Sequence, residues 1–213
     1  IAFANFPWVE YIELQRIAYE ELKKINPDAF LLTNGYACGP GGGRTDRNHL
    51  QKTLRDAGSY DILAFHGHCT YPVYKPQIKD LVDAIGKIAP AKQWYCNETA
   101  VTSSEVSKLQ QGVTLFQKLI FSWANGAMGY TWYDFRDDGY DPEFSEHNYG
   151  MVTRDFYPKP VYNVFNTLTK HLTQAEYLKE LSYVGIIEGY LFRGNDGNLY
   201  YAFWRDLESK NSK

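Results

Sequence analysis

The sequence is poor in cysteine: Cys38, Cys69 and Cys96 are the only three in 213 residues, and their spacing does not pair them. A disulfide framework is therefore not predicted, the thiols are expected to be buried, and cysteine usage does not indicate the compartment. No apolar run approaches the length of a membrane-spanning helix. Lysine and arginine form no cluster and the formal net charge is -3, which argues against a nucleic-acid partner.

An initial methionine and a signal-peptide pattern are also lacking, since the chain begins with Ile1. We expect that it was either processed or cut from something longer. Aromatic residues, by contrast, are plentiful at 16%, and 18 residues are tyrosine. Two interpretations fit this excess equally well: a surface whose flat rings stack on sugars, or a tyrosine-rich core and rim.

Short apolar segments typical of buried strands begin near residues 29, 61, 93 and 127, about 32 to 34 residues apart. Segments with helical periodicity alternate with them. Apolar strands that alternate with helices indicate an α/β fold whose parallel sheet is buried on both faces. The predicted strands are 29–33, 61–65, 93–96 and 127–135. The predicted helices are 8–26, about 46–57, 76–88, 102–125 and 160–172. The helix at 102–125 starts with the capping-box spacing of Thr102 and Glu105.

The repeat length matches one unit of a (β/α)8 barrel, and the chain has room for four units. We therefore predict half of a TIM-type barrel over residues 1–175. An open sheet leaves two apolar edge strands uncovered, so we expect the missing half-barrel or self-association to cover them. Residues 176–213 are predicted to begin an appended antiparallel β-domain, with strands 184–192 and 199–204 joined by the hairpin signal GNDGN at 194–198.

Polar and aromatic side chains follow the ends of the predicted strands. In parallel α/β barrels these ends form one rim, where active sites lie, so the side chains are expected to converge. One acid, two histidines, amides and aromatic rings together suit a polyhydroxylated ligand. The candidates are Asn34 after the first strand, His66, His68 and Tyr71 after the second, Asn97 and Glu98 after the third, and Trp132, Tyr133 and Asp134 after the fourth.

Several segments resemble clan A glycoside hydrolases. Residues 93–99 (QWYCNET) resemble the seventh strand of these enzymes, which ends in the nucleophilic glutamate, and 126–134 (GAMGYTWYD) the eighth strand, whose tryptophan lines the sugar site. Residues 148–152 (NYGMV), followed by 158–162 (PKPVY), look like the segment that leads into the eighth helix, and 61–66 is similar to the sixth strand. The resemblance covers about residues 29–172 and implies strands 5–8, the C-terminal half of the barrel.

The resemblance implies retaining cleavage of β-glycosidic bonds in an oligosaccharide or polysaccharide, without a cofactor or metal, by two carboxyl groups about 5 to 5.5 Å apart. Glu98 matches the nucleophile. Tyr71 or His68 is expected to hydrogen-bond its carboxylate, His66 to contact it or a sugar hydroxyl, and Trp132 to stack on the sugar. The other candidates are expected to bind substrate. The family favours an extracellular or periplasmic location, and the glycan and linkage are left open.

The sequence departs from the family at the acid/base residue. In the family this glutamate follows an asparagine at the end of the fourth strand, and residues 1–7 contain no acid. The chain alone is therefore expected to have little or no hydrolase activity, because general acid catalysis contributes about 10²- to 10⁴-fold. A carbohydrate-binding, degenerate barrel without catalysis is the alternative.

Several of these residues, and two loops, also allow other roles. His66 and His68, two apart on one face of a strand, could hold a metal with Asp134 as in amidohydrolase barrels, but those barrels place the pair on their first strand. The glycine run at 39–43 lacks the residues of a phosphate-binding loop and is predicted to be a surface loop. The acids at 137–141 are either solvated or a weak Ca²⁺ site. In purely structural roles, Glu98 caps the following turn and Trp132 belongs to the core.

Overall fold

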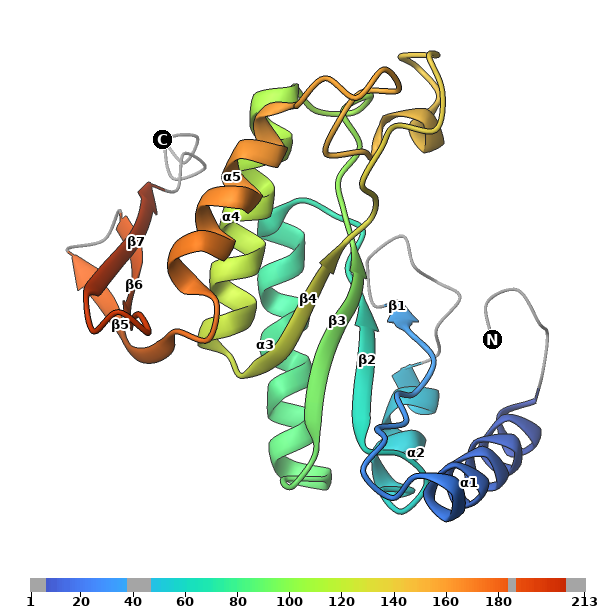
Figure 1. The fold of residues 1–213 in the computed structure, drawn as a ribbon. Coiled ribbons are helices and arrows are strands. Elements are labelled where there is room, and N and C mark those ends of the chain that lie inside the picture. Colours follow the sequence, from blue (N-terminus) through green and yellow to red (C-terminus); the bar gives the residue numbers. More distant parts are fainter. Residues whose placement is uncertain (1–6, 38–46, 184–186, 206–213) are drawn as a thin grey trace, which may run out of the picture. The chain divides into compact units, whose positions relative to one another are not determined.

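The computed structural model describes residues 7–37, 47–183 and 187–205. The chain divides into two compact units (Figure 1): Ile1–Ala100 with Asn125–Tyr133, and Val101–Ala124 with Asp134–Lys213. The domain boundary predicted at residue 175 stays a prediction. Among the described residues, no helix combines the length and the apolar character that crossing a membrane requires.

The first unit contains a parallel four-stranded sheet in the order β1-β2-β3-β4. The predicted parallel α/β arrangement is therefore confirmed. The strands are β1 (Tyr36–Ala37), β2 (Ile62–His66), β3 (Gln93–Thr99) and β4 (Ala127–Trp132), and the helices are α1 (Trp8–Ile25), α2 (Arg47–Arg55) and α3 (Tyr71–Ile88).

Helix α3 covers one face of this sheet (Figure 1). Its Tyr74 is fully buried, meets the Phe65 ring edge to face at 6.1 Å, and donates a hydrogen bond to Cys96 Sγ at 3.3 Å. Burying a large apolar side chain in this way stabilises the fold by about 1.5 to 3 kcal/mol. Of the three cysteines, Cys96 is buried as predicted, Cys69 is partly exposed, and Cys38 lies outside the described residues.

The strand predicted at 29–33 is wrong. Only Leu32 forms an isolated bridge, with Ile62, and the edge strand β1 lies further on. Side chains take the place of part of the ladder here: Thr33 Oγ1 accepts from the Ala64 amide at 2.9 Å, and an Asp61 carboxylate oxygen accepts from the amide of residue 31 at 2.8 Å. Backbone groups satisfied by side chains do not need a regular strand.

The second unit combines two packed helices with an antiparallel sheet. The helices are α4 (Lys108–Ala124) and α5 (Pro160–Leu172), which has its predicted bounds, and a short 3-10 helix, η1 (Ser145–Asn148), precedes α5. Strands β5 (Glu176–Tyr183), β6 (Ile187–Arg193) and β7 (Leu199–Arg205) pair in chain order, and the predicted hairpin joins β6 to β7. Gly197 occupies a left-handed conformation in that turn, with φ of 78°.

Two predicted helix starts are wrong. Helix α3 begins at Tyr71 rather than Pro76. Pro72 lies in its first turn, where a proline is tolerated, and Pro76 is accommodated inside the helix. Helix α4 begins at Lys108 instead of 102. The expected capping box does not form: Thr102 Oγ1 hydrogen-bonds the carbonyl of residue 145 at 3.0 Å, while Ser107 Oγ accepts from the amide of residue 110 at 3.1 Å and caps the helix.

Candidate active site

A shift in strand register brings Glu98 beside His66 at the carboxyl ends of β2 and β3. Phe65 pairs with Cys96, but the next residue, His66, pairs with Glu98, so one residue of β3 is skipped. Because successive side chains of a strand point to opposite faces, a one-residue shift changes the face that a side chain occupies. The irregularity therefore places the Glu98 carboxylate on the same face as the His66 imidazole.

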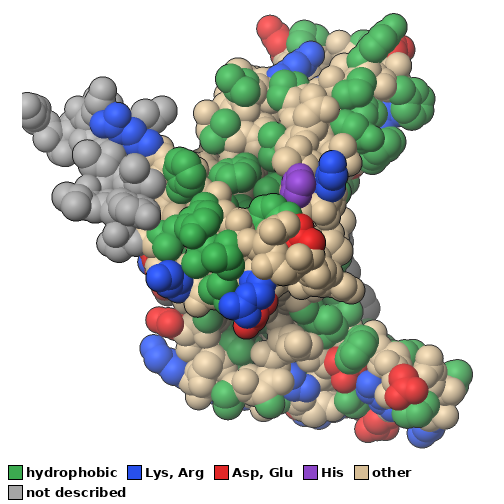
Figure 2. Space-filling model, turned by 60° about the vertical axis from the view of Figure 1, so that its left-hand side comes forward, with side chains coloured by type: hydrophobic (Ala, Val, Ile, Leu, Met, Phe, Trp, Pro, Cys, Tyr) green, Lys and Arg blue, Asp and Glu red, His purple; other side chains and the backbone are tan. Residues whose placement is uncertain are grey.

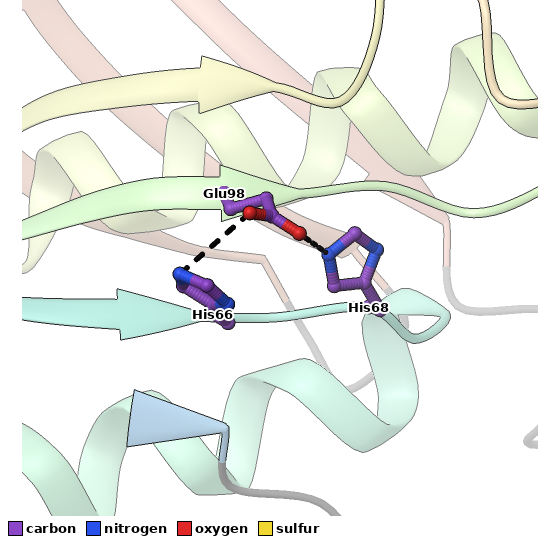
Figure 3. A group of neighbouring side chains, drawn as sticks. All are labelled: His66, His68 and Glu98. Carbon is purple, nitrogen blue, oxygen red and sulfur yellow. Dashed lines mark hydrogen bonds and ion pairs between the residues drawn. The ribbon is translucent and has the colours of Figure 1, made fainter. Parts of the chain in front are cut away.

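Two imidazole rings contact the Glu98 carboxylate (Figure 3). The Nε2 atom of His68 lies 2.8 Å from Oε1, which is a hydrogen bond, and the Nε2 atom of His66 lies 3.8 Å from Oε2. The side chains of His66, His68 and Glu98 are 26%, 32% and 39% exposed. The carboxylate is therefore held by its neighbours and remains reachable from solvent. Of the two residues expected to hydrogen-bond it, His68 does so.

Backbone and hydroxyl hydrogen bonds hold the two strand ends together. The Gly67 amide donates to the Glu98 carbonyl at 2.9 Å, and Thr99 Oγ1 donates to the Gly67 carbonyl at 2.7 Å. A side chain at Gly67 would collide with the Tyr74 ring, so the loop lies close against α3. These contacts fix the positions of His68 and Glu98 relative to one another.

Gly35 determines where the His66 ring lies, and burial affects the pKa of that ring. A Cβ atom at Gly35 would overlap the His66 imidazole, so the glycine leaves the space that this ring occupies. Burial lowers the pKa of His66; the Glu98 charge opposes this and His68 adds to it. His66 is therefore neutral at neutral pH.

The remaining candidates of the first unit surround this cluster or lie in the core. The Tyr133 ring meets His68 edge to face at 5.8 Å. The side-chain carbonyl oxygens of Asn34 and Asn97 are buried without a hydrogen-bond partner among the described residues, so the substrate contacts expected of these two residues stay a prediction. Tyr71 is 5% exposed in the first turn of α3, and Trp132, the last residue of β4, is 6% exposed.

Asp134 belongs to the second unit. Burial, with Asp138 and Asp137 adding to it, raises its pKa to about 6, and its Oδ1 atom is buried without a partner among the described residues. The carboxylate that does lie beside His66 and His68 is Glu98, not the Asp134 considered as a third metal ligand.

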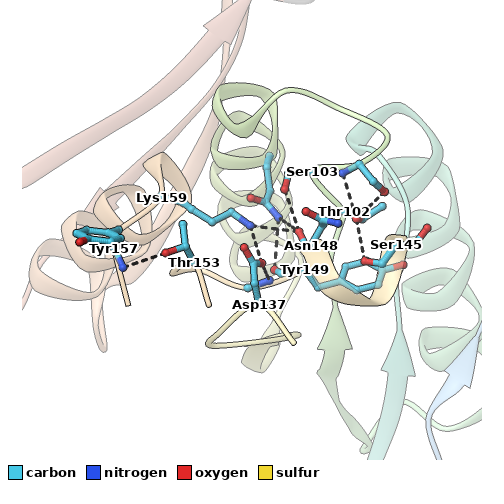
Figure 4. A network of polar contacts seen from close by, with 12 residues as sticks. Thr102, Ser103, Asp137, Ser145, Asn148, Tyr149, Thr153, Tyr157 and Lys159 are labelled. Atoms are coloured by element: carbon cyan, nitrogen blue, oxygen red, sulfur yellow. Dashed lines mark hydrogen bonds and ion pairs between the residues drawn. The ribbon is translucent and has the colours of Figure 1, made fainter. Parts of the chain in front are cut away.

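The NYG and PKP segments form a buried polar network in the second unit (Figure 4). The Asn148 carbonyl accepts from the Ser103 amide at 3.1 Å, from Gln111 Nε2 at 3.2 Å and from Lys159 Nζ at 3.2 Å. Lys159 Nζ also lies 2.9 Å from Asp137 Oδ1, and this pair is almost fully buried. These residues hold the loop before α5 in place; they are structural.

Sequence reasoning missed Gly35 and Thr99 as parts of the site. Gly35 follows the candidate Asn34, and its role depends on a close approach of the His66 ring that no local pattern reveals. Thr99 stands next to Glu98 and ends β3. A hydroxyl residue that ends an apolar strand is a weak sign of a side-chain bond to the neighbouring loop.

No protein-family model matches the chain, and no curated protein matches it. Solved structures do. A family 39 glycoside hydrolase from the gut symbiont Bacteroides cellulosilyticus WH2 has a TM-score of 0.70 at 24% identity, over 92% of this chain and 44% of that one. A Bacteroides uniformis β-glucuronidase matches with a TM-score of 0.55 at 14% identity, over 93% of this chain and 31% of that one. A family 17 β-1,3-glucanosyltransferase from Rhizomucor miehei matches with a TM-score of 0.54 at 13% identity, over 74% of this chain and 58% of that one.

These likenesses establish the fold. The four parallel strands and their helices correspond to part of the TIM-type barrel of clan A glycoside hydrolases, as predicted, and a separate antiparallel sheet follows. The chain spans between about a third and somewhat over half of the length of these three structures.

Proposed function

We propose that this chain carries the nucleophile of a retaining β-glycosidase, and that Glu98 is that nucleophile. The observation that supports this most strongly is the position of Glu98. It is a partly exposed carboxylate at the carboxyl end of a parallel strand, held by a hydrogen bond from His68. In barrels of this fold, catalytic groups come from the carboxyl ends of strands.

In the proposed reaction one Glu98 oxygen attacks the anomeric carbon of the sugar. A carbon–oxygen bond to Glu98 forms as the bond to the leaving group breaks, and the departing oxygen takes a proton from a general acid. Water then hydrolyses the glycosyl-enzyme. His68 orients the attacking carboxylate through its hydrogen bond to Glu98.

Aromatic surface in the second unit also supports a saccharide ligand. Hydrophobic side chains gather at the upper end of the view in Figure 2, the height at which Figure 1 shows the loop between β4 and α5. Flat exposed rings with apolar faces and polar edges suit stacking on sugars. The exposed rings of this loop are Phe135, Tyr140, Phe144, Phe156 and Tyr157. The stacking role predicted for Trp132 stays a prediction.

We further propose that this chain alone does not hydrolyse ordinary glycosides. In the described part of the chain, the cluster around Glu98 contains one carboxylate and two imidazoles, whereas retaining hydrolysis uses a second carboxyl group about 5 to 5.5 Å away. Further barrel strands, or a second copy of the chain, would supply that acid and cover the free sheet edges.

Leaving-group chemistry tests both parts of this proposal. A dinitrophenyl glycoside needs no protonation of its leaving group, so the chain should release dinitrophenol from one of a panel of β-glucosides, β-mannosides, β-xylosides and β-glucuronides. The matching methyl glycoside should not react, and azide should accelerate turnover because it replaces the water that lacks a base. The Glu98→Gln variant should be inactive; dinitrophenol release unchanged by this substitution would remove Glu98 from the mechanism.

Carbohydrate binding without catalysis is the second candidate, and the single carboxylate of the cluster favours it. Affinity electrophoresis through gels that contain β-glucan, β-mannan or xylan separates the two. Retardation of both the parent and the Glu98→Gln variant, with no dinitrophenol release by either, identifies a binding module. Release of dinitrophenol by the parent but not by the Glu98→Gln variant identifies the catalytic role.

A further inference from the structure

The cluster of His66, His68 and Glu98 has the composition of a transition-metal site. Each residue offers one ligand atom, and the three atoms all lie within 4.8 Å of one another. Two imidazole nitrogens and one carboxylate oxygen are a ligand set that zinc accepts, with water in the fourth position. Imidazole favours zinc, copper, iron and nickel, whereas Mg²⁺ and Ca²⁺ prefer oxygen ligands only.

The distances are close to those that zinc requires. Zinc bonds of about 2.0 to 2.2 Å in a tetrahedral arrangement place neighbouring ligand atoms roughly 3.3 to 3.5 Å apart. The contacts of Glu98 with His68, at 2.8 Å, and with His66, at 3.8 Å, lie on either side of that value. These two contacts end on different Glu98 oxygens, Oε1 and Oε2. No two of the three ligand atoms are more than 4.8 Å apart, so shifts of about 1 Å bring them within reach of one ion.

The surroundings hold the ligands in place and leave an approach to them. The His66 ring fills the space above Gly35, and the loop carrying His68 is tied to the Glu98 strand through the Gly67 amide. All three ligand side chains keep between 26% and 39% of their surface exposed. An ion can therefore enter from solvent and retain a water ligand, as open zinc sites do.

We propose that His66, His68 and Glu98 bind one divalent transition-metal ion, Zn²⁺ in the first instance. In the metal-free protein the Nε2 proton of His68 can bridge to Glu98; on binding, the neutral ring takes the other tautomer, with its proton on Nδ1, so that the Nε2 lone pair points at zinc. The ion then occupies the carboxylate oxygens of Glu98. As a consequence that rests on the proposed function, Zn²⁺ blocks the nucleophile and acts as a reversible inhibitor, not a cofactor.

Calorimetric titration of ZnCl₂ into the tag-free, chelator-treated chain tests the binding independently of any glycosidase activity. One saturable site is expected, with at least tenfold weaker affinity in each of His66→Asn, His68→Asn and Glu98→Gln. His171→Asn is the matched control, because this exposed histidine lies in the other unit and its loss should leave the affinity unchanged. Circular dichroism verifies that each variant is folded.

Co²⁺ supplies a second readout, since a tetrahedral site gives visible absorption bands that Zn²⁺ should abolish and a large excess of Mg²⁺ should not. Absence of saturable Zn²⁺ binding, or parental affinity in any one folded ligand variant, overturns the proposal. Site-specific Zn²⁺ binding in a chain that releases no dinitrophenol would uphold the metal site and leave only its inhibitory consequence without support.

Discussion

The buried Lys159–Asp137 pair gives the sharpest test of how the second unit is held together. Lys159 is 1% exposed and Asp137 is 6% exposed, and the ammonium and carboxylate are 2.9 Å apart. Burial lowers the pKa of Lys159, and the hydrogen bond to Asp137 opposes that shift. Lys159→Met keeps the aliphatic stem and removes the charge, so Asp137 is left as a buried anion.

Removing one partner of a buried ion pair costs about 3 to 5 kcal/mol. The Gly150 amide still donates to Asp137 Oδ1 at 2.8 Å, so we expect the lower end, about 3 kcal/mol. In a chain of this size that corresponds to a fall of roughly 6 to 12 °C in the unfolding midpoint. The double variant Asp137→Asn, Lys159→Met removes both charges of the pair and should lose less stability than Lys159→Met alone.

Urea unfolding followed by circular dichroism and tryptophan fluorescence measures these differences. Lys170→Met is the control, since this lysine is exposed in the last turn of the same helix and its substitution should change the free energy of unfolding by less than about 0.5 kcal/mol. If Lys159→Met is as mild as the control, or if the double variant is the least stable of all, the ion pair does not stabilise this loop.

Three further substitutions test particular contacts. Gly150→Ala should destabilise the second unit by more than about 2 kcal/mol in the same urea assay, because the new Cβ meets backbone atoms that cannot move aside. Asp134 has a pKa of about 6 in the folded chain and about 3.9 when unfolded, so the folded state binds more protons between these values. The contribution of Asp134 to stability should therefore fall as pH rises from about 4 to 6, and the difference in the free energy of unfolding between the parent and Asp134→Asn should change in that sense across a urea series over this range. Gly35→Ala should displace the His66 ring and slow dinitrophenol release without lowering the thermal midpoint, whereas Gly58→Ala, where the added Cβ meets open space, should change neither.

Helix periodicity and strand spacing sufficed to predict most of the fold. Helices α1 and α5 carry amphipathic patterns, strand β2 is an apolar run, and β3 contains the short apolar segment 94–96, so local sequence indicates both kinds of element. The edge strand could not be located in this way, because Thr33 and Asp61 side chains satisfy backbone groups that would otherwise pair in a ladder. Strand β5 was missed because its apolar residues, at 177, 178, 181 and 183, form neither a regular alternation nor a continuous apolar run.

The sequence predicts which residues belong to the candidate site, but it does not predict how their side chains are arranged. The order of strands placed His66, His68 and Glu98 at one rim, and the structure brings these three together. The register shift that turns Glu98 toward His66 depends on pairing between two strands, which no single segment encodes. Asp134 follows its strand in sequence, but its environment is set by Asp137, Asp138 and Lys159 of the second unit.

Covalent trapping tests the role of Glu98 most directly. A 2-deoxy-2-fluoro β-glycoside with a dinitrophenyl leaving group forms a glycosyl-enzyme that hydrolyses slowly, and mass spectrometry of a digest locates the sugar. The label should lie on Glu98, within the peptide that contains β3, and Glu98→Gln should remain unlabelled. A label on another residue, or equal labelling of the variant, would contradict the assignment of Glu98 as the nucleophile.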